Sequence, residues 1–391
     1  MKVVFVSNYY NHHQQALCQA LYTLTEGNFW FVATSVMRKE RKTLGYGMDT
    51  EPEYVMHSYL SPKEEKACRE RILVADVVIA GSAPEAMIAP AIRRGALVFR
   101  YSERPLKQGK DWKKYLPHMV IWNHRNPKNK PVYLLSASAY APADYKEFGL
   151  FSGKAYRWGY FPQAKVQSWD SLIARKKYTK ILWAGRLLHW KHPDDALKVA
   201  KKLREDGLSF SMEIVGIGPM ERQLREMMSA WELEDCVCMA GALSPEQVRE
   251  RMEGAGIFLF TSDKQEGWGA VANEAMNSGC AVVASHAAGS VPYLINNGQN
   301  GLVYPSGDVQ ELYERVKLLI ESPQEQIALG RKAYKTIVDT WNASEAAKRL
   351  LELSEKILAG EKAPVLYGEG PCSPAPLFYD KWMLCCEKNL D

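Results

Sequence analysis

The chain has 391 residues, of which 47% are hydrophobic, so it can bury substantial cores, and its length predicts two or three domains. Its formal net charge is only +5, although it carries 50 basic and 45 acidic side chains, which argues against a dedicated nucleic-acid binder. No apolar run has the length of a bilayer span or of a signal-peptide core. The eight cysteines lie without a CxxC pair or zinc-like spacing, so we expect a reduced, cytoplasmic protein with no metal and no resident cofactor.

In the first half of the chain, short apolar runs alternate with segments of helical length, such as 62–73. This alternation predicts a mostly parallel sheet with helices on both faces, in a first doubly wound α/β domain of residues 1–163. The predicted strands are Val3–Ser7, Phe29–Ala33, 76–80, 97–101 and 132–135.

The turn after the first strand is the usual ligand edge of such a fold. Here it contains no GxGxxG motif, which argues against a dinucleotide site. His12 and His13 could hydrogen-bond a phosphate or a sugar hydroxyl on the acceptor side. A helix cap with two exposed imidazoles explains the same residues equally well.

Two basic patches lie within this first half, at residues 38–42 and 107–115. The second patch interleaves lysines with aromatic residues, as a segment that contacts a membrane surface or a glycan would. A solvated helix face is the commoner explanation. Peripheral contact with an anionic membrane, at its inner face, is therefore a hypothesis.

A polar stretch between residues 156 and 180 indicates a linker, after which the architecture repeats in a second doubly wound domain of residues 164–340. Its first three strands, at 181–184, 212–215 and 236–240, each run into a glycine-bearing turn. We expect these turns to converge on one sheet edge, and we expect Cys236 and Cys238 to be buried together. The helix at 341–358 is predicted to return to the first domain, and the tail to residue 391 to pack there or to remain loosely ordered.

Residues 256–285 read as strand, loop, helix and strand, with Glu266 in the loop and Glu274 one turn into the helix. Gly267 and Gly269 let the backbone approach a ligand closely, and the first amides of the helix favour an anion. A phosphate with a polyhydroxylated group beside it would suit this segment. The alternative is a pair of solvated glutamates around a structural turn.

Taken together, the motifs between residues 180 and 319 resemble the donor domain of GT-B glycosyltransferases, in particular the retaining family 4 within glycosyltransferases group 1. Each motif is weak alone, but their order over one domain is specific. The resemblance is much fainter in the first half of the chain. The matching pieces are Gly185-Arg186-Leu187 with Lys191, Gly216-Ile217-Gly218-Pro219, Gly241 with its helix, Glu266-Gly267-Trp268-Gly269 with Glu274, Gly289 with Val291-Pro292, and Asn300-Gly301-Leu302-Val303.

The resemblance implies a role for each matching residue. Arg186 and Lys191 would bind the diphosphate of a UDP- or GDP-linked sugar, where charge grows on the leaving group. Glu266 would hold hydroxyls of the donor sugar, and Glu274 those of the ribose. The remaining donor-binding positions that it implies are Gly185, Gly216, Gly218, Ala242, Leu243, Gly267, Trp268, Gly269 and Ala270.

The chain departs from the family pattern at several positions. His192 stands where the family usually has glycine, Tyr293 replaces a common glutamate, and residues 11–14 replace a Gly-Gly turn. Where many members carry a histidine near the reacting sugar carbon, this chain has Glu103 and Arg104. We hypothesise that one of these two residues takes that place, with a surface ion pair as the alternative.

A carboxylate pair could also belong to a glycosidase. Nearby Arg186 and Lys191 argue against this, because cations lower the pKa of a carboxyl whereas a general acid needs a raised pKa. The chain contains no Asp-x-Asp metal motif, and retention follows only from the resemblance. We therefore predict a metal-independent, retaining transfer from a nucleotide sugar to a hydroxyl of a glycan or lipid-linked glycan, in cell-surface polysaccharide or glycoconjugate synthesis. A GT-B sugar-nucleotide epimerase and a non-catalytic sugar-nucleotide binding protein are the alternatives.

Overall fold

The structure of the protein is a computed structural model that describes residues 1–37, 50–109 and 112–383. It divides into two compact units. The first comprises Met1–Gln163 and Thr340–Tyr379, and the second comprises Ala164–Asp339 with the described residues from Asp380 on. Within the described residues, no helix combines the length and the apolar character needed to cross a bilayer.

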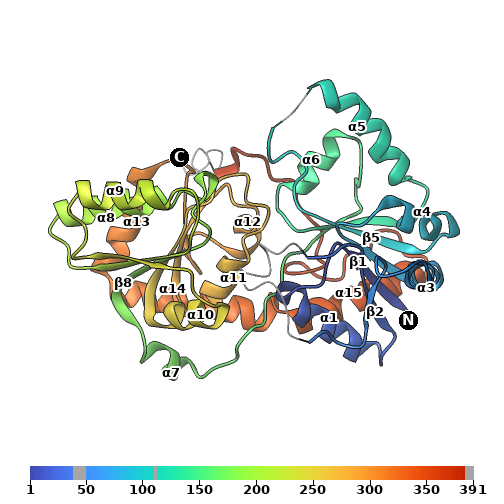
Figure 1. The fold of residues 1–391 in the computed structure, drawn as a ribbon, viewed down its shortest axis with the longest axis horizontal. Helices are drawn as coiled ribbons and strands as arrows, with labels where there is room; N and C mark the ends of the chain where they lie inside the picture. The colour runs from blue at the N-terminus through green and yellow to red at the C-terminus, as the bar shows by residue number, and fades with distance from the viewer. Residues whose placement is uncertain (38–49, 110–111, 384–391) are drawn as a thin grey trace. The chain divides into compact units, whose positions relative to one another are not determined.

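The first unit is a seven-stranded parallel sheet with the strand order β3-β2-β1-β4-β5-β6-β7 (Figure 1). In the central strand, Val3 pairs with Phe29 on one side and with Val77 on the other. The elements in chain order are β1 (Val3–Ser7), α1 (His12–Leu24), β2 (Phe29–Ala33), β3 (Val55–His57), α3 (Pro62–Val74), β4 (Val77–Ala80), α4 (Glu85–Arg94), β5 (Leu97–Ser102), α5 (Trp112–Arg125), β6 (Val132–Ser136), α6 (Ala141–Glu147) and β7 (Ala155–Arg157).

The central strands of this sheet are buried on both faces, as expected for continuous apolar runs in a parallel sheet. Local signals set the helix starts. The Asn11 side chain accepts from the amide of His13 at the start of α1, and Ser61 caps α3 with Pro62 in its first turn. The two-sided doubly wound prediction for this half is confirmed.

The first unit is completed by the end of the described chain. Helix α15 (Ala343–Leu358) packs against α1 and β5, which confirms that this helix returns to the first domain. Beyond it, Cys372 and Ala375 donate backbone hydrogen bonds to Arg157 and Ala155 of β7, both at 2.9 Å. The tail therefore pairs with the exposed edge of the sheet, a place where unpaired backbone groups invite aggregation.

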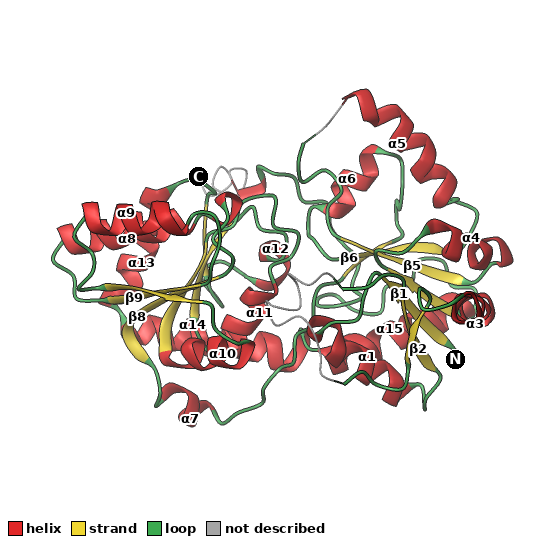
Figure 2. Ribbon diagram, in the orientation of Figure 1, coloured by secondary structure: helices red, strands yellow, loops and turns green. Residues whose placement is uncertain are grey.

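The second unit is a six-stranded parallel sheet with the order β10-β9-β8-β11-β12-β13 and helices on both faces (Figure 2). Its apolar core includes Trp183, Leu187 and Leu259. The elements in chain order are α7 (Trp169–Ile173), β8 (Lys177–Ala184), η2 (His189–Lys191), α8 (Pro193–Glu205), β9 (Ser211–Val215), α9 (Glu221–Ala230), β10 (Val237–Gly241), α10 (Pro245–Gly254), β11 (Ala255–Phe260), α11 (Ala270–Asn277), β12 (Ala281–Ser285), α12 (Val291–Leu294), β13 (Leu302–Tyr304), α13 (Val309–Glu321), α14 (Pro323–Lys335) and η3 (Thr336–Thr340).

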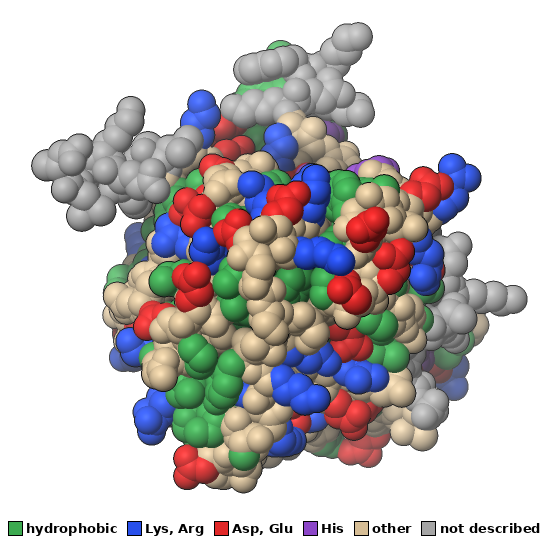
Figure 3. Space-filling model, turned by 90° about the vertical axis from the view of Figure 1, so that its left-hand side faces the viewer, with side chains coloured by type: hydrophobic (Ala, Val, Ile, Leu, Met, Phe, Trp, Pro, Cys, Tyr) green, Lys and Arg blue, Asp and Glu red, His purple; other side chains and the backbone are tan. Residues whose placement is uncertain are grey.

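One detail of the second sheet was predicted wrongly. Cys236 is only half-buried and Cys238 is exposed, because β10 is an edge strand and its buried position is Val237, of the opposite alternation. On the face that Figure 3 shows, basic and acidic side chains are interspersed, in keeping with the small net charge.

The strand orders fix where a ligand can bind. In an open parallel sheet, ligands occupy the crevice at the carboxyl ends of the strands where the order reverses. That switch point lies between β1 and β4 in the first unit and between β8 and β11 in the second. The loops that follow β8 and β11 carry Arg186, Lys191 and Glu266, so the strongest predicted site residues stand at the switch point.

Candidate active site

Backbone hydrogen bonds hold the turns after β8, β9 and β10 side by side. The Gly185 amide donates to the carbonyl of Val215 at 3.0 Å. The Gly216 amide donates to the carbonyl of Gly241 at 2.8 Å. The three glycine-bearing turns thus form one continuous edge. In the third turn, Ala242 is exposed.

Two glycines of this edge are required by the close approach of neighbouring turns. A Cβ atom on Gly216, whose φ is +139°, would lie 1.8 Å from the carbonyl oxygen of Gly185. A Cβ atom on Gly218 would lie 2.6 Å from the carbonyl oxygen of Leu187. The packing of the edge therefore explains both glycines. Their predicted contact with a nucleotide base is an additional, untested role.

Lys191 and Glu266 meet at the switch point. The Lys191 Nζ atom lies 2.5 Å from Glu266 Oε2, and their side chains are only 13% and 12% exposed. Ser262 also donates to the same carboxylate oxygen at 3.2 Å. The fold thereby joins a cation and a carboxylate that lie 75 residues apart in the chain.

A buried hydrogen-bonded relay fixes the position of Lys191. The indole of Trp183 donates to Thr261 Oγ1 at 2.8 Å, and that hydroxyl donates to the carbonyl of Lys191 at 2.6 Å. The Asp263 amide donates to the carbonyl of Trp190 at 2.9 Å. The loop after β11 therefore holds the loop after β8 on both sides of the lysine. Sequence reasoning overlooked Thr261, whose only signal is its place at the end of a buried strand.

Arg186 differs from Lys191 in its surroundings. Its side chain is half-buried, and among residues 1–37, 50–109 and 112–383 its guanidinium has no hydrogen-bond or ion-pair partner. A partly desolvated guanidinium with five free N–H donors is well suited to bind an anion such as a diphosphate.

Helix α11 begins at the same edge. Gly269 precedes it in the left-handed conformation, with a φ of +83°, and a Cβ atom there would lie 2.3 Å from the ring of Phe260. The first turn of α11, from Ala270, contains no acidic residue that would compete for its free amides. The N-terminus of the helix thus lies next to the Gly267 loop, and the predicted contact of its first amides with an anion stays a prediction.

Glu274 lies one turn into α11 and is half-buried. Burial raises the pKa of its carboxyl, and the nearby charge of Arg249 partly opposes that shift. Nearby cations would lower the pKa of a carboxyl in this site, but the pKa of Glu274 shifts in the opposite direction because burial dominates. Arg249 itself is buried and donates to the backbone carbonyl of Glu274 at 3.1 Å.

The side chain of Trp268 belongs to the core. It is fully buried, and its indole donates to Asn273 Oδ1 at 2.8 Å. Its ring lies 6.4 Å from that of Tyr293, the residue that replaces a common glutamate of the family. Any contact between Trp268 and a ligand would therefore involve the backbone.

The sequence departure at His192 has a structural counterpart. This residue has a φ of +48° and a ψ of +52°, a left-handed conformation that glycine adopts without strain. The structure therefore gives a physical reason for glycine in the family pattern. Here the imidazole Nε2 lies 3.4 Å from Asp263 Oδ2 instead.

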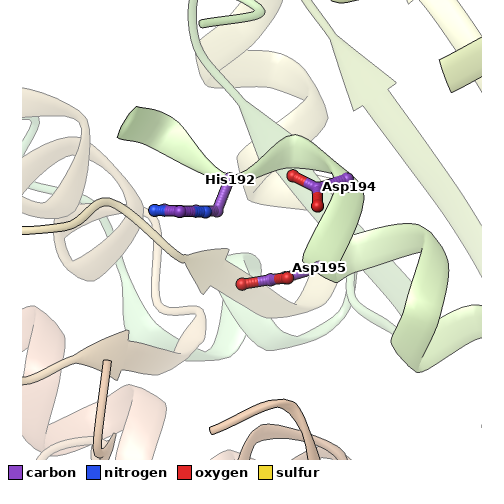
Figure 4. Close-up of side chains that lie close together, drawn as sticks. All are labelled: His192, Asp194 and Asp195. Carbon is purple, nitrogen blue, oxygen red and sulfur yellow. The ribbon is translucent and has the colours of Figure 1, made fainter. Parts of the chain in front are cut away.

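His192, Asp194 and Asp195 could together offer three atoms to a metal ion, all within 4.8 Å of one another (Figure 4). Lys198 already occupies both carboxylates, with its Nζ atom 2.7 Å from each. A cation would have to displace this ammonium group, so the donor set does not fit a resident metal. Within the described residues, no other such group occurs.

In the first unit, His12 and His13 open helix α1. Their rings lie 3.9 Å apart and are half-buried, and Asn11 supplies the side-chain cap of the helix. The alternative of a cap with exposed imidazoles therefore does not describe them. The ring of His13 also stacks on that of Tyr160 at 6.4 Å.

Tyr160 connects this histidine to Glu103. Its hydroxyl donates to Glu103 Oε1 at 2.6 Å, while Lys107 Nζ lies 3.2 Å from Glu103 Oε2. The fold thus brings His13 and Glu103 to one polar cluster at the carboxyl edge of the first sheet. Sequence reasoning did not assign Tyr160 to the site, since no local motif marks it.

Arg104 has a different environment. It forms a buried ion pair with Asp144, with Nη2 3.1 Å from Oδ1, and its guanidinium lies 4.9 Å above the ring of Tyr140. The ion pair of Arg104 is thus buried, whereas the pair of Glu103 with Lys107 is partly exposed, like the surface pair of the alternative. Arg104 is the weaker candidate because its guanidinium is held by Asp144 in the interior. The basic patch at 38–42 lies outside the described residues, as does part of the patch at 107–115.

Comparisons with known proteins point to one family. Residues 168–336, less than half of the chain, match the family Glycosyl transferases group 1. The chain is similar to the amylovoran biosynthesis glycosyltransferase AmsK of Erwinia amylovora, with 29% identity over 46% of this chain and 45% of that protein. It is also similar to WcaL of Escherichia coli, assigned as a colanic acid biosynthesis glycosyltransferase, with 27% identity over 46% and 45% of the two chains.

The fold comparison covers nearly the whole chain. HepE of Anabaena, in complex with UDP, superimposes with a TM-score of 0.66 at 15% identity, over 91% of this chain and 100% of that one. The two Rossmann-like domains therefore have the architecture of GT-B glycosyltransferases. For the second unit, the sequence findings support the family of group 1 glycosyl transferases. The chain spans about half the length of the curated relatives it matches.

Proposed function

We propose that this protein is a retaining glycosyltransferase that moves a sugar from a nucleoside-diphosphate sugar to a hydroxyl of a glycan or lipid-linked glycan. The observation that carries the proposal is the Lys191–Glu266 pair, which lies at the switch point of the unit that matches the group 1 family. An ammonium group and a carboxylate side by side suit a ligand in which a phosphate adjoins sugar hydroxyls.

The leaving group of the proposed reaction is a nucleoside diphosphate. As the glycosidic bond breaks, negative charge grows on the diphosphate oxygens. Arg186, Lys191 and the first amides of α11 supply fixed positive charge and N–H donors on one edge. Because the relay from Trp183 through Thr261 holds the backbone of Lys191, little reorganisation is needed as that charge develops.

Glu266 and Glu274 act as hydrogen-bond acceptors in this scheme. Lys191 has three N–H donors, so it can keep one on Glu266 while another binds phosphate. The pair would then orient the carboxylate toward hydroxyls of the donor sugar. Glu274 would accept from the ribose, and those hydrogen bonds would offset the cost of holding its carboxylate away from water.

Three finer points belong to the same proposal. The names of AmsK and WcaL favour a polysaccharide pathway, and the HepE complex with UDP makes UDP the first choice over GDP. Metal independence is supported by the cationic edge and by Lys198, which already neutralises Asp194 and Asp195. Retention at the anomeric carbon follows from the family resemblance.

A thermal-shift screen of nucleoside diphosphates and their sugars tests the proposal directly. Ligand at about 100 times its Kd should stabilise the native state by about 2.7 kcal/mol. We expect UDP and one UDP-sugar to raise the Tm of the wild type but not of Lys191→Ala. If no nucleoside diphosphate raises the Tm, the proposal fails.

The reaction class needs a second measurement, because an epimerase would bind the same ligands. Release of nucleoside diphosphate only after addition of an acceptor supports a transferase, whereas release without acceptor contradicts it. Activity that a chelator abolishes would overturn metal independence. An inverted anomeric configuration, measured by NMR of the product, would overturn retention.

A further inference from the structure

The carboxylate of Glu274 has no direct partner of its own. It is half-buried, yet its side chain makes no hydrogen bond or ion pair with any residue in the described parts of the chain, 1–37, 50–109 and 112–383. Burial without a partner disfavours the ionised form, and it raises the pKa of this carboxyl. A carboxylate that is to accept hydrogen bonds at neutral pH therefore needs a positive charge nearby.

The charge that acts on this carboxylate is that of Arg249, on the neighbouring helix α10 (Figure 1). The side chain of Arg249 is only 7% exposed. Its Nη1 atom donates to the backbone carbonyl of Glu274 at 3.1 Å, and its Nη2 atom donates to Asn277 Oδ1. The guanidinium is thus held against α11 at two points about one turn apart.

Asn277 is itself fixed in position. Its Oδ1 atom also accepts from the amide of Lys165 at 2.8 Å, and its Nδ2 atom donates to the carbonyl of Lys165 at 3.0 Å. Its side chain is buried. Arg249 therefore contacts an acceptor that the backbone holds still, so its charge keeps a constant position with respect to Glu274.

The other charges around α11 do not replace that of Arg249. Helix α11 packs against α10, α14 and β12, and β12 carries no charged residue. On α10, Glu253 pairs with Arg175 at 2.6 Å and with Lys165 at 3.6 Å. The remaining titratable side chains of α10 and α14 in the described chain, none of which acts on the Glu274 carboxyl, are Glu246, Glu250, Arg251, Glu325, Arg331, Lys332, Tyr334 and Lys335.

A purely structural role explains part of this arrangement. The carbonyl of Glu274 lies near the carboxyl end of α11, where a cation satisfies free carbonyls and complements the helix dipole. Such a cap stabilises the helix equally whether or not Glu274 is ionised. An electrostatic role makes the effect of Arg249 depend on that ionisation, and this dependence separates the two roles.

We propose that Arg249 is a positioning residue of the donor site, which holds α11 in place and keeps Glu274 ionised so that its carboxylate can accept hydrogen bonds from the ribose hydroxyls of UDP. This role rests on the proposed function, which assigns Glu274 to the ribose. An ionised carboxylate can accept from both vicinal hydroxyls, whereas a protonated carboxyl has a donor in place of one acceptor. Without Arg249, burial is unopposed, so Glu274 takes up a proton at a higher pH and UDP binds more weakly there.

The pH dependence of UDP binding tests this role. We define the pH ratio as the Kd for UDP at pH 6 divided by the Kd at pH 8, measured by calorimetry on the full chain. The pH ratio of Arg249→Met should exceed that of the wild type by roughly three- to tenfold, where tenfold is the loss expected when the carboxylate is absent. The phosphate of UDP also titrates in this range, but equally for every variant. In a Glu274→Gln background, Arg249→Met should leave the pH ratio unchanged.

The matched control is Arg251→Met on the same helix. Arg251 carries the same charge, but its side chain is 50% exposed and lies 3.4 Å from Glu213 instead. Its pH ratio should equal that of the wild type. Arg249→Lys keeps the charge, so its pH ratio should stay close to the wild-type value even where its Tm falls. Arg249→Gln removes the charge but keeps an amide donor, and it replaces Arg249→Met where that variant does not fold.

A second measurement needs no ligand. At pH 8, Arg249→Met should lower the Tm more in the wild type than in Glu274→Gln, because the ionised carboxylate then lacks its cation. The raised pKa of Glu274 means that this extra loss is present above that pKa and disappears as acidification protonates the carboxyl.

Two results would overturn the role of Arg249 and leave it as a cap of α11. One is an equal Tm loss in the two backgrounds at pH 8, and the other is a pH ratio of Arg249→Met that matches the wild type while UDP binds. A wild type that binds no nucleoside diphosphate, although the Tm losses differ, would instead refute the proposed function and the ribose as ligand.

Discussion

The two units carry polar clusters at equivalent sheet edges, but the clusters differ in chemistry. The edge of the second unit holds two cations next to the start of a helix: Arg186, which has no side-chain partner among the described residues, and Lys191, which belongs to a part-buried ion pair. The edge of the first unit holds an aromatic and carboxylate cluster in which Tyr160 joins His13 to Glu103. Fixed positive charge suits a phosphate, whereas rings and single hydroxyl contacts suit a sugar.

The difference explains why only one edge has a readable motif. Every nucleotide sugar contains a diphosphate, so the cations, glycine turns and helix start that bind it recur at short spacing in the sequence. An acceptor differs from one enzyme to the next, and the residues around it need only meet in space. Substitutions should therefore separate the two edges, with donor binding affected on one side and acceptor turnover on the other.

The largest effect is expected for Lys191→Ala. Loss of a charged contact that strengthens in the transition state should lower kcat/KM by roughly 100- to 1,000-fold and abolish the thermal shift with UDP. The control is Lys180→Ala, since Lys180 and Glu213 form a pair of similar length, 2.6 Å, and burial earlier in β8. Equal losses in the two variants would mean that the Lys191 pair is only structural.

Glu103→Gln and Tyr160→Phe test the first unit. A lost hydrogen bond to a charged group is worth about 1.5–3 kcal/mol, so turnover with acceptor should fall roughly 10- to 100-fold. UDP binding should not change. Tyr101→Phe is the matched control, because the Tyr101 hydroxyl donates to the carbonyl of Gly159. If UDP binding weakens with turnover, the two edges do not act separately.

Glu274→Gln should raise the Tm of the free protein by about 2 °C at pH 7.5 and weaken UDP binding about tenfold. Burial raises the pKa of Glu274 above its ordinary value of 4.5, so its ionised form costs stability in the fold. That cost is present above the raised pKa and disappears as pH falls below 4.5. The Tm difference between variant and wild type should therefore shrink on acidification, and a difference that grows would contradict the assignment.

The smallest effect is expected for His192→Gly. The left-handed backbone at this position favours glycine, so relief of strain should stabilise the protein by about 1 kcal/mol in denaturant titration. His192→Ala also removes the contact with Asp263 but keeps the strained backbone, so its free energy of unfolding should not rise. A loss of UDP binding greater than threefold in both variants would show that the imidazole takes part in the site.

Much of the fold could be predicted because buried parallel strands are continuous apolar runs bounded by turns. The missed strands, β3 and β7, are three residues long and lie at sheet edges. Each of these strands forms through pairing with its neighbour in the sheet. Strand β7 also pairs with the tail from Cys372 to Ala375. Residues as mixed as Val55-Met56-His57 carry no local strand signal.

The candidate site likewise contains residues that a motif predicts and residues that only the folded chain brings together. Family motifs predicted Lys191 and Glu266, and the fold brings them together across 75 residues. The link between Tyr160 and Glu103 spans 57 residues and has no motif. Arg104 was a candidate because it follows Glu103, but its partner Asp144 lies on another element, and only the folded chain reveals that pair.

Because α15 returns to the first unit, the two units can complete their folds in the opposite order to that in which their synthesis starts. Residues 164–339 of the second unit are contiguous, so its sheet can form as soon as they leave the ribosome. The first unit, although it is made earlier, lacks α15 and the strand-like tail until residues 340–379 follow. Until then helix α1 has no helix α15 to pack against. Of the two units, the one whose synthesis starts earlier is therefore the one that can complete its fold only later.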